Sequence, residues 1–223
     1  MGHCRSTRYN YRRRALKAMP PRRVRRQFGR LVHSMIVLLN GSFGVGKTTV
    51  ARLLRGRLAG SALYDPEWAG FVLMRLPSWV KLAGSGTDDF QDIALWRRSA
   101  VAGTRLFRYF ALGPVIVPMA FCRRAYFDEV VAGLRRLDPE LRVFCLKASL
   151  ATVRQRLVGR GATTAREEAW LERRIIECAR AHRDPHFGEP VETEGRSAGE
   201  VTEEIAGRLG QPGATTGMTR TSW

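Results

Sequence analysis

Residues 41–48 of this 223-residue chain read Gly41-Ser42-Phe43-Gly44-Val45-Gly46-Lys47-Thr48, which fits the pattern GxxxxGK[ST] at every defined position. The surroundings fit as well, because the apolar strand pattern MIVLL ends at Leu39 and the helical pattern TTVARLLRGRL begins at Thr48. Glycines let backbone N–H groups curl around phosphate oxygens, and the following helix points its positive end at the same anion. The stretch predicts a phosphate-binding loop; the alternative is a glycine-rich turn without a ligand.

Two side chains of this loop have defined chemistry toward a nucleotide. Lys47 can reach the β- and γ-phosphates of ATP as a mobile cation, and the Thr48 hydroxyl can ligate Mg²⁺. We expect the ATP site to extend over residues 41–49, up to Thr49. The strand pattern at 114–118 ends without a carboxylate, which argues against a motor-type ATPase or a switch GTPase.

Strand and helix patterns alternate from residue 35 to about residue 209. Short apolar runs predict strands at 35–39, 61–64, 114–118, 141–146 and 190–193, and helical periodicity predicts helices near 47–59, 66–76, 89–111, 124–136, 150–159, 167–181 and 198–209. This alternation favours a parallel sheet covered by helices on both faces. We expect an α/β three-layer, P-loop kinase-like fold with a five-stranded parallel sheet in the order 2-3-1-4-5 and a short lid segment.

Composition excludes several classes of protein. Apolar residues make up 44% and charged residues 26% of the chain, which is a globular profile. No run approaches the ~20 apolar residues of a membrane-spanning helix. The cysteines are widely separated and form no CxxC pair, which argues against a zinc site or a disulfide framework. A reducing cytoplasm is the simplest compartment. The four are Cys4, Cys122, Cys145 and Cys178.

The net charge of +18 is concentrated at the start of the chain. Residues 1–34 carry ten arginines, one lysine and no acid, which predicts a disordered basic extension. Three interpretations stay open: an arm for nucleic acid or anionic lipid, a lipidated start at Gly2, and a translation start that is really Met35. Because the excess lies in the extension, we expect no specific nucleic-acid partner. Residues 210–223 predict a flexible tail after the domain at 35–209.

Asp65 follows the second predicted strand, in the run Tyr64-Asp65-Pro66-Glu67. Ligands of open α/β sheets bind outside the carboxyl ends of the strands. Asp65 could therefore accept the proton of a substrate hydroxyl as the base of a phosphoryl transfer. The last three residues of this run, Asp65-Pro66-Glu67, are also typical of a helix start with Asp65 as the N-cap. Geometry permits both roles, and we favour catalysis.

Residues 88–97, DDFQDIALWR, combine aromatic faces, an amide and a cation. Gln91 could pair with the edge of an amide-like ring while Phe90 or Trp96 stacks on its face, and Arg97 could bind a phosphate or a carbonyl. The alternative is an amphipathic helix capped by Asp88 with its aromatic residues in the core, and for the aromatic residues alone this alternative is favoured.

An arginine-rich stretch follows the strand at 141–146, and a Gly-Ala-Thr-Thr break at 161–164 divides it. In small kinases this place holds a lid whose arginines close over the phosphates. Because arginine outnumbers lysine by 34 to 4 in the chain, each arginine taken singly is more readily a solvated surface charge. Arg156 and Arg160, four apart, are the best pair for a catalytic role. The stretch contains Arg154, Arg156, Arg160, Arg166, Arg173 and Arg174.

Together these segments resemble the tunicamycin-resistance protein family of small bacterial P-loop proteins. The resemblance runs from Met35 to about Leu209 and ends with Trp170 and Cys178 at matching spacing. Family chains begin near the place of Met35, so the basic extension is a departure. The motifs are NGSFGVGKTT at 40–49, YDPEWAGF at 64–71, DDFQDIALWR at 88–97, IVPMAFCRRAYFDEV at 116–130 and LKASLATVRQRLVGR at 146–160.

The resemblance implies resistance to tunicamycin, a nucleoside antibiotic with a uracil, linked sugars and a fatty acyl chain. In related folds, such as shikimate-type kinases and phosphotransferases that inactivate antibiotics, an acid after the second strand is the general base, and Asp65 occupies that place. We expect an ATP- and Mg²⁺-dependent phosphotransferase. Lys47 and the amides of 41–48 would hold the phosphates, and Arg156 and Arg160 would steady the moving phosphoryl group.

The expected substrate is tunicamycin or a similar uracil nucleoside with a lipid chain. Uracil offers an imide edge to Gln91 and a face to Phe90 or Trp96. The apolar segment 68–80, with Phe71, could hold the acyl chain or be an ordinary core helix. Because such a ligand carries a lipid chain, a peripheral contact of the protein with the inner face of the membrane is a further interpretation that stays open. The rival function is a protein that binds ATP as a structural ligand and sequesters the drug; a nucleic-acid-binding NTPase rests mainly on charge.

Overall fold

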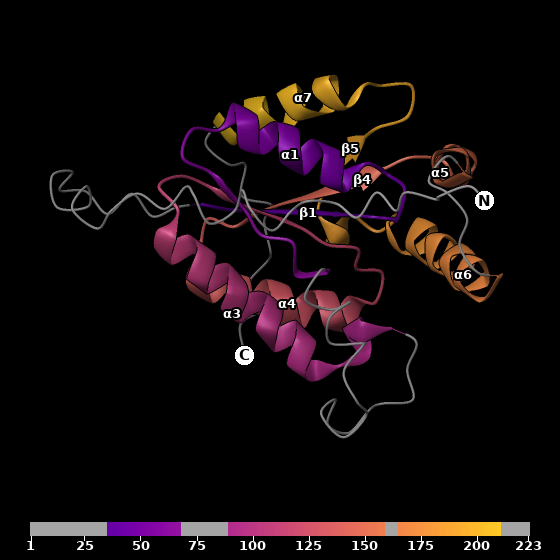
Figure 1. The fold of residues 1–223 in the computed structure, drawn as a ribbon, viewed down its shortest axis with the longest axis horizontal. Coiled ribbons are helices and arrows are strands. Elements are labelled where there is room, and N and C mark those ends of the chain that lie inside the picture. The colour runs from indigo at the N-terminus through magenta and orange to yellow at the C-terminus, as the bar shows by residue number, and fades with distance from the viewer. Residues whose placement is uncertain (1–34, 68–88, 159–164, 211–223) are drawn as a thin grey trace, which may run out of the picture. The chain divides into compact units, whose positions relative to one another are not determined.

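A five-stranded sheet forms the frame of the site (Figure 1). The computed structural model describes residues 35–67, 89–158 and 165–210, all within the unit His33–Trp223. The strand order is β2-β3-β1-β4-β5 and every pairing is parallel, so the predicted fold class, strand number and order are confirmed. The strands are β1 (Ile36–Gly41), β2 (Ala62–Leu63), β3 (Val115–Pro118), β4 (Arg142–Lys147) and β5 (Glu189–Glu192).

β1 is the central strand, and all six of its residues are buried. Leu38 lies opposite Val117 of β3 and Val143 of β4. A strand with neighbours on both edges and helices on both faces buries the side chains on both of its faces, which is why residues 36–39 are a continuous apolar run rather than an alternating one. β1 therefore delivers the residues that follow Gly41 to the middle of the carboxyl edge of the sheet.

Helices cover both faces of the sheet (Figure 1). On one face, α1 (Lys47–Arg57) and α7 (Ala198–Gly210) pack on a core that includes Leu39 and Phe144. On the other face, α3 (Ala94–Phe110) and α4 (Arg124–Leu137) pack on a core that includes Trp96 and Phe121. The remaining helices, α5 (Leu150–Val158) and α6 (Ala165–Ala181), pack against each other. In the described ranges, no helix has both the length and the hydrophobicity needed to cross a bilayer.

One predicted helix is divided. The range expected at 89–111 begins as the 3-10 turn η2 (Phe90–Asp92), and α3 starts only at Ala94, because Ile93 is extended. The cap is Asp89, whose Oδ1 accepts a hydrogen bond from Gln91 N at 2.9 Å. A second 3-10 turn, η3 (Pro185–Phe187), precedes β5. Several predictions lie outside the described residues: the basic extension at 1–34, most of the helix at 66–76, the apolar segment 68–80 with Phe71, the cap Asp88, Arg160 with the break at 161–164, and the tail beyond Gly210.

Candidate nucleotide and phosphoryl-transfer site

The loop between β1 and α1 has the backbone of an anion cradle. Gly46 caps α1 in the left-handed region with φ 107°, and a Cβ built on it would meet open space rather than protein. Gly44 also has a left-handed φ of 78°, and a Cβ there would come within 2.9 Å of Leu157 Cγ. The first turn of α1 contains no acid, so the helix itself supplies no carboxylate at its positive end. Thr48 and Thr49 are exposed beside it.

Lys47 is the cation of this loop. Its Nζ donates hydrogen bonds to the carbonyl oxygens of Gly41 and Ser42, both at 2.9 Å, and lies 5.5 Å from the ring centroid of Phe43. The residue is 7% exposed. The ammonium is thus held over the loop by backbone oxygens of the same loop, where an arriving phosphate would meet it.

Arg156 of α5 braces the loop from the side. Its Nη1 donates to Val45 O at 3.1 Å and to Thr193 Oγ1 at 3.0 Å, and its Nη2 donates to Thr193 O at 2.8 Å. The structure thus ties α5, the loop and the end of β5 together through one guanidinium. The predicted contact of Arg156 with a transferred phosphoryl group is not tested by this arrangement. Its neighbour Arg154 pairs instead with Glu172 of α6 at an exposed position.

Asn40 is a buried polar residue that sequence reasoning did not identify. Its Oδ1 accepts a hydrogen bond from Phe121 N at 2.9 Å, and its Nδ2 donates to Phe187 O at 3.3 Å. Asn40 therefore fixes the end of β1, just before the phosphate loop, to the segments that follow β3 and α6. The only signal for it is a polar side chain at the end of an otherwise apolar strand.

Two carboxylates follow β2. Asp65 Oδ1 accepts a hydrogen bond from Glu67 N at 3.1 Å, which is the contact of a capping aspartate. This bond agrees with the capping role and leaves the catalytic role as a prediction, because a carboxylate has several acceptor positions.

Glu67 has the more perturbed environment of the two. Its Oε1 is buried and has no hydrogen-bond partner among the described residues. Burial raises the pKa of Glu67 to about 7; the Lys47 ammonium opposes this shift, and Asp65 and Asp89 add to it. The charge of the phosphate loop therefore acts on a residue after β2, which indicates that the two segments lie close together. No pattern singles out Glu67, and its place two residues after Asp65 is the only signal in the sequence.

The two aromatic residues predicted to stack on uracil are core residues in this structure. Phe90 is 3% and Trp96 is 1% exposed, and their ring centroids are 4.8 Å apart. Trp96 Nε1 donates to Pro66 O at 3.0 Å. These are the contacts of the core alternative, and they hold the residues after β2 against α3.

The amide and the cation predicted to bind substrate are also engaged. Gln91 is 1% exposed and its Nε2 donates to Ala120 O at 3.0 Å. Arg97 Nε donates to Glu129 Oε2 at 2.5 Å, and its Nη1 donates to Gln91 O at 2.6 Å. Both side chains fix η2 to its neighbours, and their contact with a ligand stays a prediction.

One face of α6 and the residue directly after the helix contact the segments around the site. The residues are four apart: Arg174 and Cys178 on α6, and His182 just beyond its end. Arg174 pairs with Asp89 Oδ2 at 2.9 Å, and both side chains are buried. His182 Nε2 lies 2.7 Å from Phe121 O, so this nitrogen carries the proton and donates it. Burial lowers the pKa of His182 to about 4, which keeps the ring neutral at pH 7. The face anchors α6 to the residues after β3.

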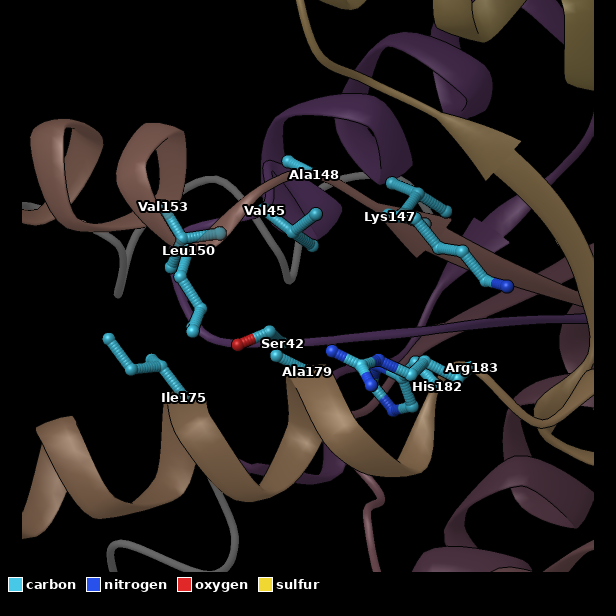
Figure 2. A pocket seen from close by; sticks show the side chains of 11 residues that line it. Ser42, Val45, Lys147, Ala148, Leu150, Val153, Ile175, Ala179, His182 and Arg183 are labelled. Atoms are coloured by element: carbon cyan, nitrogen blue, oxygen red, sulfur yellow. The ribbon is translucent and has the colours of Figure 1, made fainter.

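A cavity of about 130 Å³ opens beside the phosphate loop (Figure 2). Its wall is formed by Ser42 and Val45 of the loop, the end of β4, and apolar side chains of α5 and α6 such as Val153 and Ile175. Ser42 Oγ is buried and has no hydrogen-bond partner among the described residues. Sites for whole small molecules enclose ~300–1,000 Å³, so this cavity can hold only part of a nucleoside.

The described residues fit a magnesium ion that arrives with the nucleotide. Within them, no three His, Cys, Asp or Glu side chains gather closely enough to hold a metal. β3 ends at Pro118 and continues into Met119 and Ala120, so no carboxylate stands at this strand end. Mg²⁺ usually keeps several waters and takes one or two protein ligands beside phosphate oxygens, which the exposed Thr48 hydroxyl can satisfy.

Comparison with known proteins agrees with this geometry. The AAA domain family matches residues 36–185. A search of curated proteins finds no match. The structure is similar to that of the Deinococcus radiodurans tunicamycin resistance protein, with 27% identity, coverage of 80% of this chain and 98% of that chain, and a TM-score of 0.61. This similarity confirms the resemblance inferred from the motifs.

Two further solved structures share the fold. A sugar kinase from Janibacter sp. HTCC2649 is 19% identical, with coverage of 79% of this chain and 94% of that chain and a TM-score of 0.56. Shikimate kinase from Bacteroides thetaiotaomicron is 14% identical, with coverage of 78% and 98% and a TM-score of 0.51. At these identities the likeness establishes a P-loop kinase-like fold and no substrate.

Proposed function

Because this chain belongs to the AAA domain family, we propose that it is an ATP- and Mg²⁺-dependent phosphotransferase that modifies tunicamycin or a related uracil nucleoside. The observation that carries the proposal is that an acid after β2 interacts with the cation of the phosphate loop: the Lys47 ammonium lowers the pKa of Glu67, and the neighbouring Asp65 raises it. Anion cradle, cation and carboxylates at one edge of a sheet are the parts that phosphoryl transfer requires.

In the proposed reaction, the amides of residues 41–49 and the Lys47 ammonium bind the phosphates of ATP. The Thr48 hydroxyl would hold the Mg²⁺ that arrives with the nucleotide, and the ion would neutralise charge on the phosphates. A substrate hydroxyl oxygen bonds to the γ-phosphorus as the bond to the ADP oxygen breaks, and Asp65 takes the hydroxyl proton. Arg156 keeps the loop in place, and Arg160, outside the described residues, is the proposed contact with the moving phosphoryl group.

The substrate class rests on similarity to a protein named for tunicamycin resistance. A uracil contact by Gln91 requires this buried side chain to become accessible, and stacking on Phe90 or Trp96 requires these rings to leave the core. Arg97 is equally bound within the protein. We therefore expect the uracil contacts to form with a rearrangement of η2, and the acyl chain to lie along the segment that contains Phe71.

Sequestration of the drug is the second candidate function. It is favoured by one observation, the strand end at Pro118 without a carboxylate, where nucleotide-hydrolysing proteins commonly keep an acid. In that case ATP is a structural ligand and resistance follows from affinity alone.

The two functions separate in one experiment. The full chain is incubated with ATP, Mg²⁺ and tunicamycin, and the drug is followed by mass spectrometry. Transfer adds one phosphoryl group, a gain of about 80 Da. Lys47→Ala should abolish the product, whereas Arg55→Ala, which removes an exposed cation in the last turn of α1, is the control for loss of a positive charge. Unchanged drug mass together with tight drug binding would establish sequestration instead.

A further inference from the structure

Two thiols that are distant in the sequence meet close to the carboxyl end of β1. Cys122 follows β3 directly after Phe121, the residue whose N–H donates to Asn40, and Cys178 lies on the buried face of α6. Cys122 Sγ contacts the carboxylate of Glu177, the residue before Cys178 on α6, and the thiols of Cys122 and Cys178 interact with each other. Cys178 is fully buried, whereas Cys122 is partly exposed and can be reached from solvent.

The surroundings favour ionisation of Cys122 over Cys178. Donation by the Cys178 thiol lowers the pKa of Cys122, and the Arg174 guanidinium, one helical turn away on α6, acts in the same direction. Burial and the carboxylates of Glu177 and Asp89 oppose the shift. The Cys122 sulfur also lies 3.7 Å from Glu177 Oε2. In the same pair, the pKa of Cys178 is raised, because its proton is held in the bond to Cys122 and because it is buried.

We propose that Cys122 and Cys178 are a reversible oxidation site for hydroperoxides, at which a disulfide joins α6 to the residues after β3. The Cys122 thiolate attacks one oxygen of hydrogen peroxide and bonds to it as the O–O bond breaks. The other oxygen leaves as hydroxide, and Cys122 becomes a sulfenic acid. The Cys178 sulfur then attacks that sulfur, its proton goes to the departing oxygen, and water is released. Over both steps the two thiols lose two electrons and hydrogen peroxide is reduced to two waters.

The third cysteine of the sheet region provides a contrast. Cys145 is 1% exposed in the middle of β4, and burial raises its pKa to about 12. A buried thiol that keeps its proton is inert toward peroxide. The proposed reactivity toward peroxide is therefore a property of the pair Cys122 and Cys178, and Cys145 does not share it.

The disulfide between Cys122 and Cys178 should also raise the melting temperature of the protein. It links residues 56 apart in the sequence, and a cross-link across a loop of this length restricts the unfolded chain substantially. The oxidised protein should therefore melt ~4–10 °C above the reduced protein, and dithiothreitol should reverse the shift.

The test uses the full chain carrying Cys4→Ser, so that three thiols remain. After treatment with hydrogen peroxide, peptide mapping without reduction should show one linked pair, Cys122 with Cys178, and a mass loss of about 2 Da. Cys145→Ser should leave the link intact. In Cys178→Ser, the sulfenic acid of Cys122 should persist and react with dimedone.

Two outcomes would overturn the proposal. One is a linked peptide that contains Cys145 in place of either partner. The other is oxidised wild-type protein in which Cys122 accumulates as a dimedone-reactive sulfenic acid without forming the bridge. Because the mapping is carried out on the chain with both thiols present, failure of a variant to fold leaves the result decisive. It is also independent of whether the protein transfers phosphate.

Discussion

Replacing Glu67 by glutamine should stabilise the folded protein above neutral pH and change its stability little near pH 5. Glutamine has the shape of a protonated glutamate, so the substitution removes the ionisation and preserves the packing. The reason for the expected effect is the buried Oε1, which has no hydrogen-bond partner among the described residues. An ionised carboxylate in that place loses its hydration without gaining an equivalent donor.

The pH range of the effect follows from the pKa of Glu67. Burial raises it from 4.5 to about 7. Below pH 4.5 the side chain is neutral in the folded and the unfolded chain alike. As the pH rises toward 7, the unfolded chain releases the proton while the folded chain retains it, so the free energy of unfolding falls. At about 1.4 kcal/mol per pKa unit, the total loss is ~3 kcal/mol, and most of it develops between pH 5 and pH 8.

The measurement is urea unfolding of wild type and Glu67→Gln at pH 5 and pH 8. The variant should gain about 2–3 kcal/mol relative to wild type between the two pH values. Glu140→Gln, at an exposed position after α4, controls for the loss of one negative charge. If Glu67→Gln and wild type differ by the same free energy at both pH values, the carboxylate does not titrate in this range and the account of its burial is wrong.

Three further substitutions test the roles of single side chains. Lys47→Ala should abolish ATP binding in calorimetry while the far-ultraviolet circular dichroism stays that of wild type, because the loop loses its only cation. Asp65→Asn should change stability by less than ~1 kcal/mol, since an amide oxygen can still cap the helix, yet lower turnover ~10²–10⁴-fold; unchanged turnover would leave capping as its only role. Arg156→Ala should weaken ATP binding ~10-fold or more, because Val45 O in the loop and Thr193 O after β5 lose the charged donor that joins them. Arg154→Ala breaks an exposed ion pair and should have little effect, so equal losses in the two arginine variants would contradict the bracing role.

The parts of the site that depend on local sequence were predictable. The phosphate loop is specified within eight residues, because the left-handed backbone at Gly44 and Gly46 and the helix start at Lys47 require particular residues at fixed spacing. The strands were predictable to within two residues, because a short apolar run between two helical patterns is typical of a buried strand. The strand order came from the likeness to small kinases rather than from the strands themselves.

The contacts between distant segments were not predictable. Arg156 reaches Val45 over 111 positions, and nothing in a chain with 34 arginines separates this one from a surface charge. The pair of Arg174 with Asp89 likewise depends on how α6 packs against η2. The four cysteines look unrelated along the chain, and two of them meet only because α6 lies against the residues after β3. Spacing rules detect sites within one segment, and these contacts join several.

Several features at the carboxyl edge of the sheet cost folding stability. Ser42 Oγ and Glu67 Oε1 are buried without hydrogen-bond partners among the described residues, and α1 begins without an acid in its first turn. A core selected for stability alone would have satisfied these atoms or replaced them, because each unpaired buried polar group costs ~1–3 kcal/mol. A phosphate bound at the start of α1 would supply the missing negative charge. The same charge would draw the Lys47 ammonium from the carbonyl oxygens that now hold it. The atoms that lower the stability of the fold are therefore also atoms of the proposed site. A substitution such as Glu67→Gln, which should stabilise the protein, should also remove a negative charge from that site.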